Sequence, residues 1–129
     1  MTRLDAILTA SDCVDSGRFS RHLADLVSFE TESQNPDQEA ELGRYLNEGL
    51  APRFLDLGFT CEIYANPVAS AGPILVAERI EDTALPTILS YGHGDVIRAQ
   101  TGQWRDGLHP FRLLEDRNSN GVSAAENMG

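Results

Sequence analysis

The side chains best suited to chemistry in this sequence are a histidine and an aspartate separated by one residue, His93 and Asp95. They follow an apolar run, residues 87–91, that predicts a buried strand, and open α/β sheets bind ligands just beyond the carboxyl ends of such strands. Metal-binding histidines usually donate their second ring N–H to a carboxylate, which fixes the tautomer and the ring orientation. Gly92 and Gly94 would let the backbone turn sharply and approach an ion closely. Spacing alone leaves both a structural turn and a metal site open.

The sequence around this pair resembles a known enzyme family. Gly-His-Gly-Asp-Val at residues 92–96, followed by Trp104 and by Pro110-Phe111, is similar to the N-terminal signature of the M20 metallopeptidases. That family includes acetylornithine deacetylase, succinyl-diaminopimelate desuccinylase, glutamate carboxypeptidase and dipeptidases related to carnosinase. Two further features agree with it, Thr31-x-Ser33 after the first predicted long helix and Leu57-Gly58-Phe59 at the end of the second. The resemblance runs from about residue 19 to residue 129 and matches roughly the first third of a typical member.

The resemblance implies an active site with two zinc ions, for which cobalt is an alternative metal. His93 would be a ligand of one zinc ion, and Asp95 would be the catalytic aspartate that supports and orients this histidine. A second family motif, Gly-Arg-Gly-x-x-Asp-x-Lys-Gly, normally follows further along the chain and supplies an aspartate that bridges both ions. Glu126 stands where that aspartate is expected, so the resemblance makes it the third candidate, as a metal ligand.

The segment around Glu126 matches the second motif only in outline. The two outer glycines are present as Gly121 and Gly129, whereas the expected Arg, Gly and Lys are replaced by Val122, Ser123 and Met128. A glutamate is still an oxygen ligand, but its extra methylene would move the bridge.

The function implied by the resemblance is hydrolysis of an amide bond in an N-acyl amino acid or a small peptide. Zinc would polarise the carbonyl and lower the pKa of bound water, and a glutamate would take the proton. The later carboxylates, the C-terminal histidine and the lid or dimerisation domain of the family cannot be assigned in residues 1–129. We therefore expect the N-terminal portion of a catalytic domain, inactive by itself, from a family whose full-length members can form homodimers. The alternative is a non-catalytic truncated remnant or an interaction module.

The composition sets limits on other functions. Lys and Arg number 10 and Asp and Glu number 20, so the formal net charge is −10, which disfavours nucleic acids and anionic membrane surfaces as partners. The hydrophobic share of 41% is typical of one globular domain. Neither a signal peptide nor an apolar run of about 20 residues is visible, which predicts a cytoplasmic protein. Two cysteines exclude a disulfide-dense scaffold and favour reduced thiols.

Two long helices are predicted in the first half of the chain. Apolar residues recur at helical spacing within residues 17–29. A second helix should begin at Pro36 with Asn35 as its cap, and should end at Gly58. Pro52 predicts a kink or a fresh helical start inside it.

Strands are predicted to follow the helices. Residues 59–65 alternate in polarity and predict the first strand. The apolar residues 74–77 start a second strand that ends near Ile80, and residues 87–91 predict the third. Residues 4–9 are a shorter apolar patch that predicts one or two helical turns, and residues 97–129 predict a long loop. The elements predict an α/β fold whose sheet is unfinished, and the resemblance makes it the N-terminal part of an αβα-sandwich zinc-peptidase-like domain.

Other residues with reactive side chains have simpler interpretations. His22 should lie on the surface of the first long helix, and His109 in a solvated loop. Trp104 should pack its loop over the edge of the sheet. Cys13 is interpreted as a small buried hydrophobic residue, because no partner lies at ligand spacing.

Overall fold

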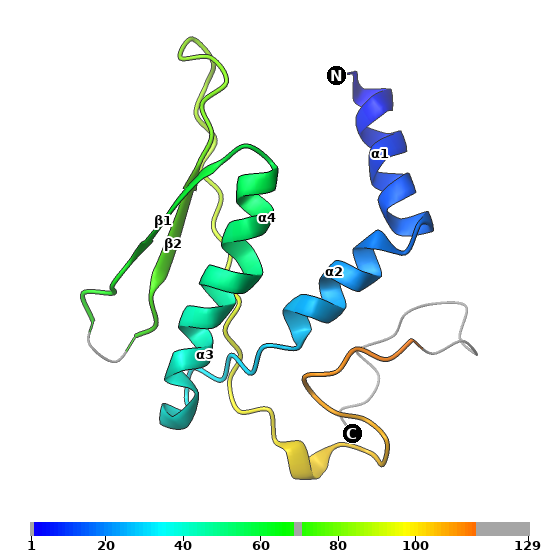
Figure 1. Cartoon of the computed structure of the whole chain (residues 1–129), viewed down its shortest axis with the longest axis vertical. Coiled ribbons are helices and arrows are strands. Elements are labelled where there is room, and N and C mark those ends of the chain that lie inside the picture. Colours follow the sequence, from blue (N-terminus) through cyan, green and yellow to red (C-terminus); the bar gives the residue numbers. More distant parts are fainter. Residues whose placement is uncertain (1, 69–70, 116–129) are drawn as a thin grey trace.

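The computed structural model describes residues 2–68 and 71–115 of the chain, in which helices precede a two-stranded sheet (Figure 1). The helices are α1 (Arg3–Asp15), α2 (Arg18–Val27), a 3₁₀ turn (Pro36–Gln38), α3 (Glu39–Arg44), a π-helical turn (Tyr45–Leu50) and α4 (Ala51–Asp56). Strands β1 (Thr60–Tyr64) and β2 (Ile74–Glu78) follow, and a 3₁₀ turn (Thr101–Gln103) lies in the last described loop. The described chain is therefore mixed α/β.

Helix α1 is longer than the one or two turns predicted for residues 4–9. It begins with a reciprocal cap, in which the Asp5 amide donates to the Thr2 hydroxyl at 3.2 Å and the Thr2 amide donates to the Asp5 carboxylate at 2.8 Å. These bonds hold the pKa of Asp5 below its ordinary value. Gly17, with a φ of +70°, then separates α1 from α2, which confirms the helix predicted from residue 17 onward.

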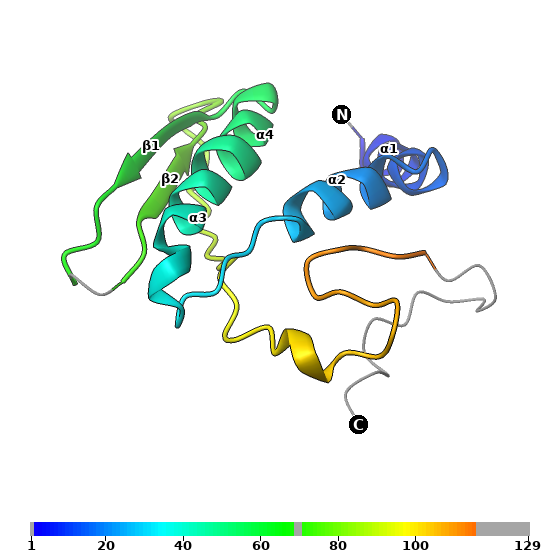
Figure 2. The ribbon, with the colours of Figure 1, turned by 60° about the horizontal axis from the view of Figure 1, so that its bottom comes forward.

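The second predicted helix is a segmented helical rod (Figure 2). Asn35 caps it as predicted, since its side-chain oxygen accepts from the Asp37 amide at 3.2 Å. Pro52 lies in the first turn of α4, directly after the π-helical turn, which confirms the predicted fresh start at this proline. Gly58 has a φ of +81°, and the amide after it donates to the Phe54 carbonyl at 3.0 Å, so this glycine ends the rod as predicted.

The sheet is an antiparallel pair in which Cys61 lies opposite Ala77 and Ile63 lies opposite Leu75. These four residues share one face and are half-buried, which confirms the predicted alternation in β1. That face lies against α4, because the Cys61 thiol is 3.8 Å from the Ala51 carbonyl oxygen. The opposite face is exposed, so the described helices cover one side of the sheet.

The third predicted strand, residues 87–91, is wrong. The segment is extended but pairs with no strand in the described ranges, and its large side chains are almost fully exposed: 87% for Ile88, 95% for Leu89 and 91% for Tyr91. A strand with apolar side chains on both faces needs neighbouring strands and cover on each side. The described residues supply one hairpin and a single layer of helices, so the apolar pattern has nothing to pack against.

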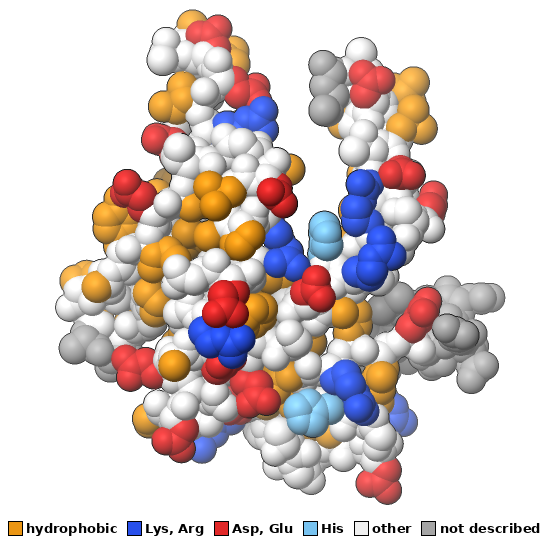
Figure 3. Space-filling view, in the orientation of Figure 1, with side chains coloured by type: hydrophobic (Ala, Val, Ile, Leu, Met, Phe, Trp, Pro, Cys, Tyr) orange, Lys and Arg blue, Asp and Glu red, His pale blue; other side chains and the backbone are white. Residues whose placement is uncertain are grey.

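Packing in the described chain is open. No hydrophobic side chain in residues 2–68 and 71–115 is fully buried, and apolar side chains are visible on α1 and over the α4 half in Figure 3. Two edge-to-face ring pairs contribute to the packing, Phe29 with Tyr45 at 5.7 Å and Phe54 with Phe59 at 5.4 Å between centroids. None of the helices in these ranges has the length and apolarity that a membrane crossing requires.

Candidate functional site

The structure brings His93 and Asp95 into contact. The Nδ1 atom of His93 lies 3.2 Å from the Asp95 carboxylate and 3.2 Å from the Asp95 main-chain carbonyl oxygen. Both partners are acceptors, so Nδ1 must carry the proton that it donates. In a neutral ring the Nε2 atom then keeps its lone pair. The His93 side chain is 68% exposed, so this nitrogen is open to a ligand or to solvent.

The turn that carries this pair is fastened to the loop after α2, 63 residues earlier. The Val96 amide donates to the Thr31 carbonyl at 2.9 Å, and the Ser33 amide donates to the Val96 carbonyl at 2.9 Å. The Thr31 hydroxyl donates to the Gly94 carbonyl at 2.7 Å. Thr31-x-Ser33, noted in the sequence only as a family feature, is therefore the strap that holds residues 94–96.

The same strap lowers the pKa of Asp95. The Ser33 hydroxyl, which donates to the Val96 carbonyl at 3.2 Å, is the largest cause that holds the pKa of Asp95 below its ordinary value, and the bond from His93 acts in the same direction. Partial burial of the carboxyl opposes both effects. The lowered pKa keeps Asp95 ionised at neutral pH, which strengthens the hydrogen bond that it accepts from His93.

A second carboxylate extends the strap beyond the turn. Glu32 accepts from the Ala99 amide and, at 3.0 Å, from the Asn35 side-chain amide. These two bonds, the one from Ala99 first, lower the pKa of Glu32, and the charge of Arg98 adds a smaller effect. The Glu32 carboxylate is therefore used to join two loops and is not free as a ligand.

A glycine is needed at position 94 because a neighbouring side chain leaves no room for a Cβ atom, and not because of its backbone φ angle. A Cβ atom at this position would lie 2.1 Å from a ring carbon of Tyr45, whereas one at Gly92 would meet nothing within 4 Å. Neither glycine has a positive φ, so the sharp turn predicted from them is not the reason for a glycine here. Burial of the Tyr45 ring raises the pKa of its hydroxyl. The ring forms a wall against which the turn rests.

The other predicted residues lie away from this turn or outside the described chain. Glu126 belongs to residues 116–129, which are not described. His22 is exposed on α2, and His109 is exposed in a loop where its ring lies 6.2 Å from that of Phe111, which confirms both interpretations. Trp104 donates its indole N–H to the Ala99 carbonyl at 2.8 Å, so it closes its own loop.

The cysteines contribute nothing to the candidate site. Cys13 and Cys61 are free thiols, as predicted. Both are half-buried, Cys13 at the end of α1 and Cys61 in β1. Cys13 was expected to be buried and is only half-buried, because no residue of α1, to which it belongs, is fully buried.

The donor set around His93 fits one position of a zinc site. The described residues contain no group of three or more His, Cys, Asp or Glu side chains placed to hold a metal ion. His93 offers a neutral imidazole nitrogen with a carboxylate behind it, which is the usual arrangement at zinc. A catalytic zinc uses about three protein ligands, so His93 needs partners from outside the described residues.

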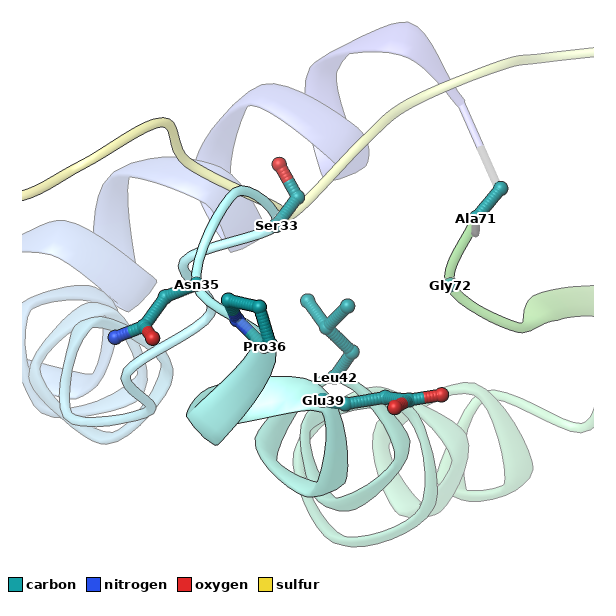
Figure 4. Close-up of a pocket in the computed structure, with 7 residues that line it drawn as sticks. All are labelled: Ser33, Asn35, Pro36, Glu39, Leu42, Ala71 and Gly72. Atoms are coloured by element: carbon teal, nitrogen blue, oxygen red, sulfur yellow. The ribbon is translucent and has the colours of Figure 1, made fainter. Parts of the chain in front are cut away.

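A hollow of about 210 Å³ lies beside Ser33 of the strap (Figure 4). It is bounded by the loop after α2, by α3 and by the loop between the strands, and is lined by Ser33, Asn35, Pro36, Glu39, Leu42, Ala71 and Gly72. His93 and Asp95 do not line it, and Ser33 of the strap links the hollow to the turn through its bonds to Val96.

No protein-family model matches the chain, and neither the curated proteins nor the solved structures include a significant match to it. Function must therefore be inferred from the motif and from the geometry of the turn. Sequence reasoning found His93 and Asp95 by their spacing. It missed Thr31 and Tyr45 as supporting residues, because contacts across dozens of residues leave no local signal.

Proposed function

We propose that this chain carries the first metal-binding segment of an M20-type zinc-dependent hydrolase that cleaves amide bonds of N-acyl amino acids or small peptides. The observation that supports this proposal is the direction of the His93 ring. Its Nδ1–H is donated to Asp95, which leaves an exposed Nε2 on a turn that is hydrogen-bonded on both sides. In this reading the αβα sandwich is the fold to which the described helices and hairpin belong.

Each residue at the turn has a stated task in such a site. His93 supplies a nitrogen ligand, Asp95 fixes the tautomer and orientation of the ring, and the Thr31–Ser33 strap keeps Asp95 in place. Zinc, when bound, supplies a Lewis acid for the substrate carbonyl and a bound water of lowered pKa. Glu126 remains the proposed bridging ligand, and the pair of zinc ions and the homodimer remain properties proposed for the whole enzyme.

The 129-residue chain by itself should show no measurable hydrolysis of N-acetyl amino acids or dipeptides. One histidine with one supporting carboxylate is fewer than the roughly three protein ligands of a catalytic zinc. Zinc-dependent turnover by the purified chain, abolished in His93→Ala, would show that this expectation of inactivity is wrong.

A non-catalytic remnant or interaction module is the second candidate function. It is favoured by the exposed apolar side chains of Ile88, Leu89 and Tyr91, which a folded enzyme domain would cover. The nucleotide sequence downstream of codon 129 separates the two. A continuing frame with paired glutamates and a late histidine supports the hydrolase, and an immediate stop supports the remnant.

Metal titration tests the role of His93 directly. Zinc or cobalt(II) is added to the chain while the ring resonances of its three histidines are followed by NMR. We expect the His93 resonances to respond at the lowest metal concentration, and the response to vanish in His93→Ala. His22→Ala and His109→Ala are matched controls, because both rings are exposed and neither faces an aspartate in the described structure. Equal responses from all three histidines would contradict the proposal.

A further inference from the structure

Thr31 is the one polar side chain that the described structure buries, with an exposed fraction of 3%. It makes two bonds to the turn. Its hydroxyl donates to the Gly94 carbonyl at 2.7 Å, and its carbonyl accepts from the Val96 amide at 2.9 Å. Gly94 and Val96 are the two neighbours of Asp95, so one residue holds the backbone on both sides of the aspartate.

The turn is also confined by Tyr45, which belongs to the π-helical turn. The Tyr45 ring lies so close to Gly94 that a methyl group would not fit between them. Gly94 is thus enclosed by the Thr31 hydroxyl and the Tyr45 ring, which come from different parts of the helical half of the chain. Side chains held by several such contacts keep a site in its working geometry.

The His93 ring depends on this arrangement, because both of its acceptors belong to Asp95. An exposed imidazole without a fixed partner can carry its proton on either nitrogen. If Asp95 moves, the carboxylate and the carbonyl oxygen leave Nδ1 together.

We propose that Thr31 is a positioning residue, whose bonds to Gly94 and Val96 hold Asp95 so that His93 keeps its proton on Nδ1 and presents Nε2. The significance of Nε2 for metal binding rests on the proposed function. The effect on the tautomer does not, because it follows from the contacts of this chain alone.

The experiment measures the ring nitrogens of His93 by ¹⁵N NMR at a pH where the ring is neutral. The unmodified chain should show a protonated Nδ1 and an unprotonated Nε2. Thr31→Val keeps the shape but removes the hydroxyl, and should shift the ring toward a mixture of tautomers. Thr31→Ser restores the hydroxyl and should restore the Nδ1–H form. Thr60→Val is the matched control, because the Thr60 hydroxyl also donates to a main-chain carbonyl, that of Glu78.

Amide exchange in the unmodified chain keeps the test decisive even if Thr31→Val does not fold. The Val96 amide should exchange much more slowly than those of Leu89 and Tyr91 in the exposed segment. Exchange of Val96 as fast as that of Leu89 would overturn the proposal. An unchanged Nδ1–H form in a folded Thr31→Val would also overturn it.

Measuring zinc affinity tests the positioning role of Thr31 and the proposed hydrolase function separately. Loss of a residue that orients a metal-binding histidine typically lowers the metal affinity by about 10-fold to 100-fold. We expect the lower end of this range for Thr31→Val. A tautomer change without any zinc binding at His93 would support the positioning role and contradict the hydrolase. Zinc binding at His93 that Thr31→Val leaves unchanged would support the hydrolase and contradict the positioning role.

Discussion

Residues 87–91 and residues 93–96 are neighbours in the chain and differ sharply in how they are held. The first segment has the apolar pattern of a core strand, yet Leu89 is 95% exposed and no described strand pairs with the segment. The second is a glycine-containing turn, yet it is joined to Thr31 and Ser33 by main-chain and side-chain hydrogen bonds. The better-fixed segment is the one with the weaker hydrophobic pattern.

The difference shows what each kind of interaction needs. Apolar residues gain free energy only when other atoms exclude water from them, and the hairpin with its single helical layer does not reach residues 87–91. Hydrogen-bonded turns need only one partner segment at the right distance. The loop after α2 provides that partner, so the turn is ordered without a surrounding core.

Replacing the apolar residues of the exposed segment should have the largest effect. We expect the chain to bind a hydrophobic dye and to associate with itself, and Ile88→Ser with Leu89→Ser to weaken association by about 100-fold or more, from the roughly 1.5–3 kcal/mol of each buried side chain. Ile7→Ser with Leu8→Ser removes the same residue pair from α1, where the exposed fractions are 50% and 58%, and should weaken association less. Dye fluorescence and light scattering measure both.

A urea melt of the unmodified chain tests whether residues 87–91 are exposed in solution. A sharp two-state transition from a monodisperse monomer would show that residues 1–129 complete their own core. The comparison between the two segments would then be wrong, because residues 87–91 would be covered in solution. An equal loss of association in both double variants would contradict the special role of Ile88 and Leu89.

Adding one methyl group to the turn should have an intermediate effect. Gly94→Ala places a carbon against the Tyr45 ring, and overpacking of this kind costs about 1–3 kcal/mol. The cost should appear as faster amide exchange at Val96, because the turn must move away from the strap. Gly92→Ala is the matched control, since its new carbon meets no atom within 4 Å. Equal exchange rates in the two variants would mean that the turn is not confined by Tyr45.

Local signals in the sequence predicted the helical half of the fold. Asn35 and Pro36 marked a helix start, Pro52 a fresh turn and Gly58 a stop, each through a constraint that acts within a few residues. The alternation around Cys61 gave the buried face of β1 for the same reason. The contact of His93 with Asp95 is equally local, because one intervening residue keeps the two side chains within reach.

Features that depend on distant residues could not be predicted in this way. The burial of Thr31 requires a turn 63 residues later, and the need for a glycine at 94 requires a tyrosine on the helical rod. The failure at residues 87–91 has the same origin, because an apolar pattern states what could be buried and not whether neighbours exist. The apolar residues 4–9 mark only part of α1, which begins after the reciprocal cap of Thr2 and Asp5 and continues to Asp15.

The smallest predicted effect is that the stability of the turn at residues 94–96 depends on pH. The folded chain lowers the pKa of Asp95 below the ordinary value of about 3.9, first through the Ser33 hydroxyl and then through His93. The unfolded state therefore binds the proton more readily, so the stabilisation is complete above the unfolded pKa and is lost as pH falls through the folded pKa. The Asp95 side chain is 45% exposed, and solvent screening limits the contribution to less than about 1 kcal/mol.

Removing the Ser33 hydroxyl should make the stability of the turn depend less on pH. Ser33→Ala is expected to raise the pKa of Asp95 toward its ordinary value, because the Ser33 hydroxyl, which donates to the Val96 carbonyl at 3.2 Å beside Asp95, is the largest cause of the lowering. An NMR titration of the Asp95 carboxyl carbon measures this, and Val96 amide exchange at decreasing pH measures the turn. Ser28→Ala is the control, because the Ser28 hydroxyl donates to the main-chain carbonyl of Asp25. A pKa of Asp95 that stays equally low in Ser33→Ala would assign the shift to His93 instead, and the strap would then act on the backbone of the turn alone.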